Sequence, residues 1–173
     1  MDEAKEYALS DDDIRKLLGG DIKITTYPDL DKVHHLNELF DRRGRAILFV
    51  PQTDATNGHW TAMIKNGREI EFFDPYGEEP EEQKSSFFKG KFHQLHMDEP
   101  LLAKLLDDSG YRIYFNKVQL QELSNDVNTC GRHCVCRLLY YKFPIERYRE
   151  MIKRSGDSPD DFVCKMTYRE LGR

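Results

Sequence analysis

Cysteine is scarce in this chain: 173 residues include four, three of them between positions 130 and 136. So few cysteines, so placed, cannot form the disulfide framework of a small secreted protein. No apolar stretch approaches the ~20 residues needed to span a bilayer, and the opening residues Met1 to Lys5 lack a signal-peptide pattern. We therefore expect a protein of a reducing compartment that is neither secreted nor inserted in a membrane.

A strong charge of one sign is also missing. The formal net charge is -5, with 33% charged and 39% hydrophobic residues, which fits one compact domain over residues 1–173 and argues against general nucleic-acid binding. One local run, from Arg132 to Arg154, is basic. It predicts a solvated helix face, with contact to an anionic partner as the alternative.

Residues 1–44 are expected to be mainly helical. Ser10 and the acidic residues 11–13 are typical of a capped helix start, and Gly19-Gly20 of its end. A second short helix is expected around residues 31–40, with His34 and His35 on its surface or packed against neighbours.

A series of strands is predicted in the centre of the chain, over residues 46–50, 60–64 and 69–73. Asn66-Gly67 is a strong hairpin signal, and a two-residue loop there sets residue i opposite residue 133-i. His59 and Asp74 would then face each other with Cβ atoms ~5 Å apart, so that the carboxylate can hold the imidazole. A longer turn would change this register.

The later segments alternate between helix and strand. We expect a helix over residues 98–106, a buried strand over 111–115 and a helix over 144–154, so that residues 143–173 form a helical C-terminal part. Residues 77–91 are interpreted as a surface excursion beside a cleft. His93 and His96 are either a surface pair or a metal pair, and the surface pair is favoured.

Cys130 is the candidate nucleophile. It begins an apolar helical run, with Asn128-Thr129 as the N-cap, and the unpaired amides and helix dipole there favour a thiolate. Gly131 would let a substrate carbonyl approach the sulfur. An inert buried cysteine is one alternative. Zinc is another, although the spacing lacks a Cys-x-x-Cys pair; its possible ligands would be Cys130, His133, Cys134, Cys136 and Cys164.

Cys130, His59 and Asp74 together supply the nucleophile, base and orienting acid of Cys-His-Asp catalysis. An oxyanion donor is still needed. Gln119 and Gln121 lie just upstream of the helix, and a side-chain amide of one of them could stand beside the backbone N–H of Cys130.

Four ordered motifs carry a family resemblance: residues 58–60 (Gly-His-Trp), 72–77 (Phe-Phe-Asp-Pro-Tyr-Gly), 120–121 (Leu-Gln) and 129–134 (Thr-Cys-Gly-Arg-His-Cys). They resemble the adenain-like cysteine proteases, which include the adenovirus maturation protease and relatives in virophages, polinton-type elements and large DNA viruses. The SUMO-specific proteases are more distant members of the clan. The resemblance covers residues 45–142, which we take as the catalytic core.

The resemblance implies a role for each matching residue. Cys130 would attack the scissile carbonyl, His59 would be its base or ion-pair partner, and Asp74 would orient His59. Gln121 would help to form the oxyanion hole, and Trp60 would shield the site. The family places its Gln closer to the Cys than here, which implies a small insertion in residues 124–128; Gln121 is still preferred to the more distant Gln119.

The implied fold is α+β and papain-like, with a central, mostly antiparallel sheet and the catalytic Cys at the start of a buried helix. The implied function is a viral-type endopeptidase that processes capsid or other virion precursor proteins, in the virion and the host-cell cytoplasm, without a cofactor or metal. Some members of the family need an activating peptide or DNA, so either is a possible partner of this chain. The alternatives are a protease that removes ubiquitin-like or SUMO-like modifiers and a noncatalytic binding or zinc module.

Overall fold

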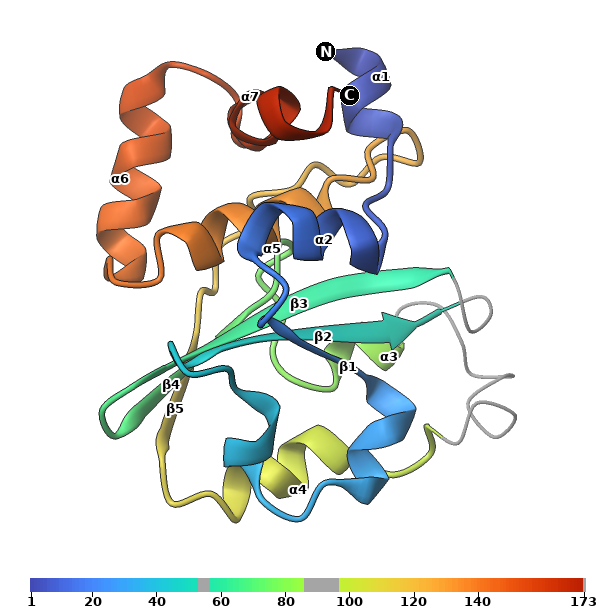
Figure 1. Ribbon diagram of the computed structural model, residues 1–173, viewed down its shortest axis with the longest axis vertical. Coiled ribbons are helices and arrows are strands. Elements are labelled where there is room, and N and C mark those ends of the chain that lie inside the picture. The colour runs from blue at the N-terminus through green and yellow to red at the C-terminus, as the bar shows by residue number, and fades with distance from the viewer. Residues whose placement is uncertain (53–56, 86–96, 173) are drawn as a thin grey trace.

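The structure is a computed structural model that describes residues 1–52, 57–85 and 97–172 (Figure 1). The helices are α1 (Asp2–Glu6), α2 (Asp11–Leu18), α3 (Glu82–Ser85), α4 (Leu101–Asp107), α5 (Cys130–Leu139), α6 (Ile145–Ser155) and α7 (Pro159–Leu171), with the 3-10 helices η1 (Tyr27–Lys32) and η2 (Leu36–Leu39). The strands are β1 (Lys23–Thr26), β2 (Arg45–Pro51), β3 (Gly58–Asn66), β4 (Glu69–Phe73) and β5 (Arg112–Phe115).

The five strands form one mixed sheet in the order β1-β2-β3-β4-β5. The central pairs, β2 with β3 and β3 with β4, are antiparallel, whereas β1 and β5 join the two edges in parallel. The α+β class is as expected, and the sheet is mixed, with the predicted antiparallel pairing confined to its central strands. The N-terminal part, residues 1–44, is mainly helical, as expected, but it also contains the strand β1. This strand has only four, partly exposed residues, too few for a clear alternating pattern.

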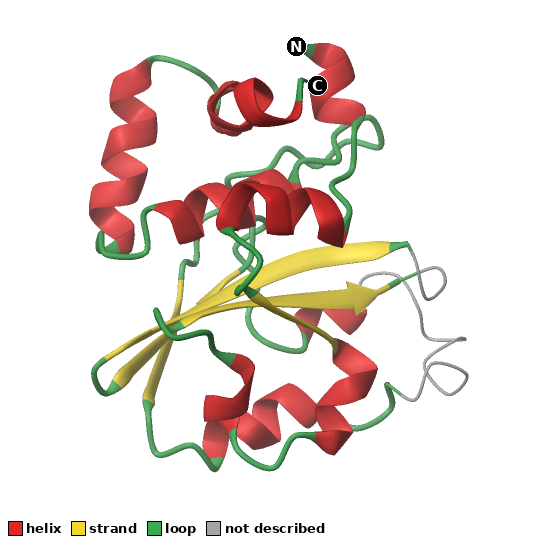
Figure 2. Cartoon of the chain, viewed as in Figure 1, coloured by secondary structure: helices red, strands yellow, loops and turns green. Residues whose placement is uncertain are grey.

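The sheet lies between two layers of helices (Figure 2). On one side α2 and α5 lie next to the strands, with α6, α7 and α1 farther out; on the other side lie η1, η2 and α4. Alternate residues of the strands point to opposite faces and supply a hydrophobic core on each side, so that Trp60 and Ala62 join one core and Met63 the other. α5, the most buried helix, packs directly on β3.

The hairpin between β3 and β4 has a different register from the predicted one. Asn66 pairs with Glu69, so the two loop residues are Gly67 and Arg68. Gly67 has φ +60°, and Arg68 does not have a positive φ. A glycine at the first loop position is typical of a type II′ turn, whereas Asn-Gly in the loop would need a positive φ at both positions. The pairing is therefore shifted by two residues from the predicted one.

This shift of two residues leaves His59 and Asp74 on the same face of the sheet, because side chains along a strand alternate with a period of two. Ala62 pairs with Phe73, so the chain places Asp74 next to Thr61 rather than directly opposite His59. His59 and Asp74 are diagonal neighbours at the strand ends, a separation that long side chains can bridge.

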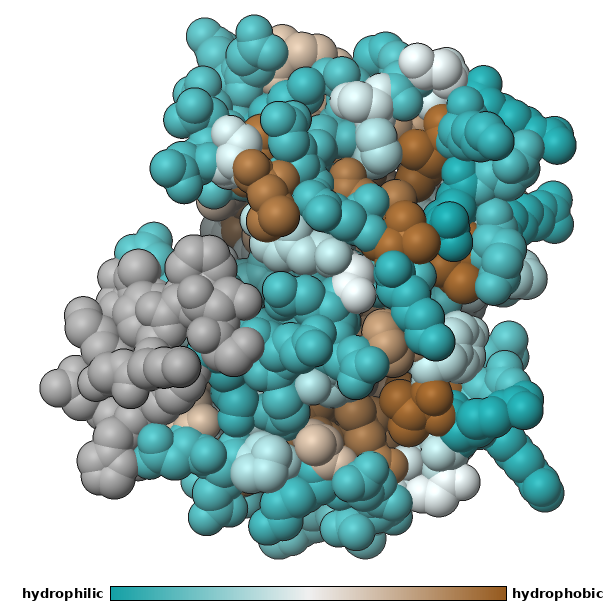
Figure 3. All heavy atoms as spheres, turned by 180° about the vertical axis from the view of Figure 1, so that it is seen from behind, coloured by the Kyte–Doolittle hydropathy of each residue, from teal (hydrophilic) through white to brown (hydrophobic). Residues whose placement is uncertain are grey.

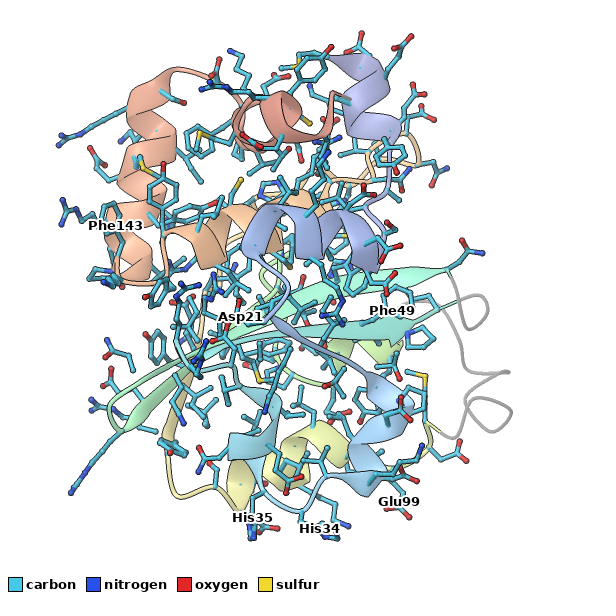
Figure 4. All side chains as sticks on the ribbon, in the orientation of Figure 1. Asp21, His34, His35, Phe49, Glu99 and Phe143 are labelled. Atoms are coloured by element: carbon cyan, nitrogen blue, oxygen red, sulfur yellow. The ribbon has the colours of Figure 1, made fainter. Side chains whose placement is uncertain are left out.

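The helix starts and ends follow local sequence signals. Ser10 forms the predicted capping box with Asp13 at the start of α2, and Gly19 follows its end. The second short helix is replaced by η1 and η2. His34 and His35, between these two, are exposed and lie at the end of the molecule away from α1, as Figure 4 shows.

The basic run from Arg132 to Arg154 does not form a single solvated face. Its later cations are exposed, but Arg132 and Arg137 are 0% and 1% exposed. Arg137 forms a bidentate ion pair with Glu71 of β4, with N–O distances of 2.7 and 3.1 Å. The prediction failed for these two residues because their partners, Glu71 for Arg137 and Thr167 for Arg132, are distant in sequence.

Other expected elements are largely present. α4 and α6 confirm two predicted helices, whereas β5 is partly exposed at the sheet edge rather than buried. His93, His96 and part of the 77–91 excursion lie outside the described residues. Within the described ranges, we find no helix with the length and apolar character to cross a membrane. On the face shown in Figure 3, hydrophilic residues cover most of the described part.

Candidate active site

His59 and Asp74 form a buried pair at the ends of β3 and β4. The distance from Nε2 of His59 to Oδ1 of Asp74 is 2.8 Å, and the two residues are 4% and 0% exposed. Gly58, just before His59, has no room for a side chain: a Cβ there would lie 2.3 Å from the carbonyl oxygen of Val50. This glycine lets β2 and β3 approach where the histidine is placed.

Gln83 is a partner of Asp74 that the sequence did not reveal. Its Nε2 donates to Oδ2 of Asp74 at 2.6 Å and to the backbone carbonyl of Glu79 at 2.9 Å, and the residue is 3% exposed. The backbone N–H of Tyr76 donates to Oδ1 at 2.8 Å. Both oxygens of the carboxylate are thus held, which fixes the side of Asp74 that faces His59.

Asn116, which directly follows β5, fixes the backbone of Asp74. Its Oδ1 accepts from the Asp74 N–H at 3.1 Å, and its Nδ2 donates to the Asp74 carbonyl at 2.8 Å. The Tyr76 ring stacks on the His59 imidazole, with centroids 5.0 Å apart. Gly77 then turns with φ +77°, and a Cβ there would lie 2.7 Å from the backbone of Val118. The Asp-Pro-Tyr-Gly motif therefore orients His59 through the Asp74 carboxylate and the stacked Tyr76 ring.

Cys130 is the first residue of α5, as predicted, and its sulfur lies close enough to the His59 side chain for the two groups to shift each other's pKa. Because Nε2 of His59 faces Asp74, Nδ1 is the ring nitrogen available to the sulfur. Burial raises the pKa of the Cys130 thiol, but the hydrogen bond and charge of His59 and the N–H groups of Trp60 and Gly131 lower it more. The net pKa lies below the usual 9.0.

The His59 pKa moves the other way. Burial lowers it, but the hydrogen bonds with Asp74 and Cys130 outweigh burial and raise it from 6.5 to about 10. In contrast, burial raises the pKa of Cys134, Cys136 and Cys164. Of the four thiols, only Cys130 has a pKa shifted toward the thiolate form, and the pKa of its neighbour His59 is shifted toward the imidazolium form.

The oxyanion candidates occupy different positions. Gln121 is 2% exposed, and its Nε2 donates to the carbonyl of Val127 at 3.0 Å, three residues before Cys130. Its Oε1 has no hydrogen-bond partner among the described residues. Gln119 is exposed, donates to the Gln121 carbonyl and lines a separate pocket beside α6. Gln121, rather than Gln119, is therefore hydrogen-bonded to the residues just before Cys130. Its catalytic role stays a prediction.

Trp60 and Gly131 lie together beside the sulfur. The indole N–H of Trp60 donates to the carbonyl of Leu9 at 2.9 Å. A Cβ on Gly131 would lie 3.0 Å from Leu9 and 3.1 Å from Trp60. We expected the glycine to leave room for substrate; the structure shows that Leu9 and Trp60 use this room.

A groove of about 720 Å³ reaches the sulfur of Cys130, which is 8% exposed. It extends between the segment before α2 and the ends of β1 to β3, where Phe49 lies in Figure 4. This volume is in the range of ligand sites in proteins. Residues that define its walls are Leu9, Thr26, Phe49, Gly58, Trp60 and Asn128.

The possible zinc ligands have other surroundings in the structure. His133 lies 3.0 Å from Asp160 through its Nε2, and all four cysteines are free thiols. Among residues 1–52, 57–85 and 97–172, no three His, Cys, Asp or Glu side chains converge into a group that could hold a metal ion.

Comparisons with known proteins include a virophage relative and a distant solved structure. "Uncharacterized protein V9" of Sputnik virophage is 31% identical over 181 residues, covering 96% of this chain and 99% of that protein. No family model matches the chain. The central domain of the uncharacterized Lpg1148 protein from Legionella pneumophila aligns over 96% of this chain and 99% of that one, with 13% identity and a TM-score of 0.46. A likeness at that level supports no argument about function.

Proposed function

We propose that this chain, which belongs to the protein family of the uncharacterized protein V9 of Sputnik virophage, is a cysteine endopeptidase that processes virion precursor proteins. One observation carries the proposal: Cys130, at the start of a buried helix, contacts a histidine that is held by a buried carboxylate. The papain-like and adenain-like assignment belongs to this proposal, supported by the order of His59, Asp74, Gln121 and Cys130.

In the proposed reaction, the thiolate of Cys130 attacks the carbonyl carbon of the scissile peptide bond. The C–N bond then breaks, and the His59 imidazolium gives its proton to the departing amine, which leaves a thioester on the sulfur. Neutral His59 next takes a proton from water, whose oxygen attacks the thioester. The carboxylic acid product leaves, and the regenerated thiolate again pairs with the imidazolium. Asp74 accepts from Nε2 throughout and stabilises the charged ring.

The oxyanion formed in each step needs hydrogen-bond donors. The first-turn amides of α5, beginning with Cys130, have no carbonyl partner within the helix and form the positive end of its dipole. We assign a second donor to Gln121, whose amide would exchange the Val127 carbonyl for the oxyanion when substrate binds. Active-site hydrogen bonds often reach their final geometry only in the substrate complex.

The groove beside Cys130 would hold an extended peptide segment, and its position between the N-terminal segment and the sheet leaves the sulfur at its inner wall. Capsid or other virion precursors are the proposed substrates, since the family includes a virophage protein. A peptide or DNA activator can be included as a separate arm of the assay.

The test is co-expression with virion proteins of the same virus, followed by mass mapping of new termini. We expect cleavage by wild type, none by Cys130→Ala or His59→Ala, and slower cleavage by Asp74→Asn. Cys136→Ala is the matched control, because this thiol is buried in the same helix and has a raised pKa. A peptidyl vinyl sulfone should label one thiol per chain in wild type and Cys136→Ala.

Two results would contradict the proposal. Near-wild-type cleavage by His59→Ala would show that the base is wrong. Rapid turnover of a ubiquitin or SUMO fluorogenic conjugate, lost in Cys130→Ala, together with intact virion proteins, would indicate a modifier protease instead.

A further inference from the structure

A second histidine–carboxylate pair lies behind the proposed nucleophile. Asp160, in the first turn of α7, is 4% exposed. Its Oδ1 accepts from the hydroxyl of Thr129 and from Nε2 of His133, the latter at 3.0 Å, and its Oδ2 accepts from the backbone N–H of Glu122 at 3.0 Å. One carboxylate therefore binds three donors from two segments of the chain.

The three donors flank the groups that the proposed reaction needs. Glu122 follows Gln121 directly, Thr129 precedes Cys130, and His133 lies one turn farther along α5. Thr129 and His133 are both fully buried. Asp160 thus connects the segment of the expected oxyanion glutamine to the start of the helix that carries the sulfur.

Thr129 is used in an unusual way for an N-cap residue. A threonine in this position ordinarily accepts a hydrogen bond from an N–H of the first helical turn. Here its hydroxyl donates to Asp160, and α5 begins without a side-chain cap among the described residues. The sequence indicated the position of the N-cap correctly, but the capping bond is absent. The amides beside the sulfur remain available to a substrate oxyanion.

The charge on Asp160 suits this arrangement. Burial raises its pKa, but the hydrogen bonds from His133 and Thr129 and the His133 charge outweigh burial, so the net pKa lies below the usual 3.8. An ionised carboxylate has acceptor sites for all three donors, whereas an asparagine amide would have to present an N–H to one of them.

We infer that Asp160 is a positioning residue for the proposed peptide-bond hydrolysis: it draws the Thr129 hydroxyl away from the first-turn amides of α5 and holds Glu122 so that Gln121 lies beside them. This inference rests on the proposed function. In Asp160→Asn, the released hydroxyl can cap α5 and compete with the oxyanion.

The experiment compares Asp160→Asn, Thr129→Val and the double variant, with Asp161→Asn as control. Asp161 is the adjacent carboxylate and pairs with Lys5 at 2.9 Å near the surface. The probe is a quenched-fluorescence peptide containing a cleavage site mapped by the co-expression experiment. The rate of Cys130 alkylation by iodoacetamide is measured in parallel, because it reports the thiolate without requiring an oxyanion.

We expect Asp160→Asn to lower kcat by about tenfold or more, as for loss of an oxyanion contact, with KM within about threefold. Its alkylation rate should stay within about twofold of wild type, because the Cys130–His59 pair is untouched. Adding Thr129→Val removes the competing hydroxyl, so the double variant should recover part of the lost kcat. Asp161→Asn should resemble wild type.

Equal kcat for Asp160→Asn and Asp161→Asn, or a double variant no faster than Asp160→Asn, would overturn the inference. If Asp160→Asn does not fold, His133→Gln and His133→Leu replace it: Gln keeps an N–H for Asp160 and should be the faster, and equal rates would overturn the inference. A wild-type protein that cuts no virion protein and no peptide would instead overturn the protease proposal, and with it this role.

Discussion

The buried ion pair between Glu71 and Arg137 allows a sharp prediction about stability. Their side chains are 1% and 2% exposed, and the guanidinium also donates to the carbonyls of Tyr140 and Phe143 at 2.8 Å. Glu71→Gln keeps the size of the side chain but leaves the cation without its counter-charge. The same strand has a matched pair at the surface, because Glu69 pairs with Arg112.

Breaking a buried pair from one side costs about 3–5 kcal/mol, and we take about 3 kcal/mol for Glu71→Gln because the amide oxygen still accepts one hydrogen bond. For a domain of this size, that loss lowers Tm by about 6–12 °C. The Glu69 and Arg112 side chains are 37% and 78% exposed, so Glu69→Gln should cost at most about 1 kcal/mol.

Urea unfolding followed by circular dichroism gives the free energy of unfolding of both variants, and calorimetry gives their Tm values. The m-values should match that of wild type, so that the change reports stability alone. If the two variants differed by less than about 1 kcal/mol, the reasoning about burial would be refuted.

Two predictions concern the catalytic pair and its support. Alkylation of Cys130 should be half-maximal below pH 9, the usual thiol value, and should shift to higher pH in His59→Ala; activity should decline at alkaline pH as His59, with a pKa near 10, loses the proton that the leaving amine needs. An unchanged alkylation profile in His59→Ala would contradict the ion pair. Gln83→Ala should lower kcat about tenfold by freeing one oxygen of Asp74, and Gln83→Glu should lower it further through like-charge repulsion; wild-type kcat in both would contradict this support.

The parts of the fold that local signals determine were predictable. Short apolar runs bounded by turn residues indicated the central strands, and the Ser10 box and the start of α5 followed from capping patterns. The two-residue loop of the hairpin was predicted one position too early, at Asn66-Gly67, whereas Gly67 and Arg68 form it. The error did not separate His59 from Asp74, since a shift of two residues keeps both on one face.

The features that were missed depend on contacts between distant residues. Gln83 is an ordinary surface glutamine by composition, and only the return of the chain to Asp74 gives it a partner. Arg137 was predicted on a solvated basic face, because its carboxylate partner lies in another element of the fold. Asp160 reaches the start of α5 from a helix about thirty residues later, so no local pattern indicates it.

The wall of the groove formed by residues 8–10 has a practical consequence. The indole N–H of Trp60 holds this wall in place by donating to the Leu9 carbonyl, and the Leu9 side chain also packs over Gly131. A recombinant fragment beginning at Asp11 would keep Cys130 and His59 but lose the wall of the groove that residues 8–10 form. Expression boundaries for crystallisation or inhibitor screening should therefore retain the first ten residues.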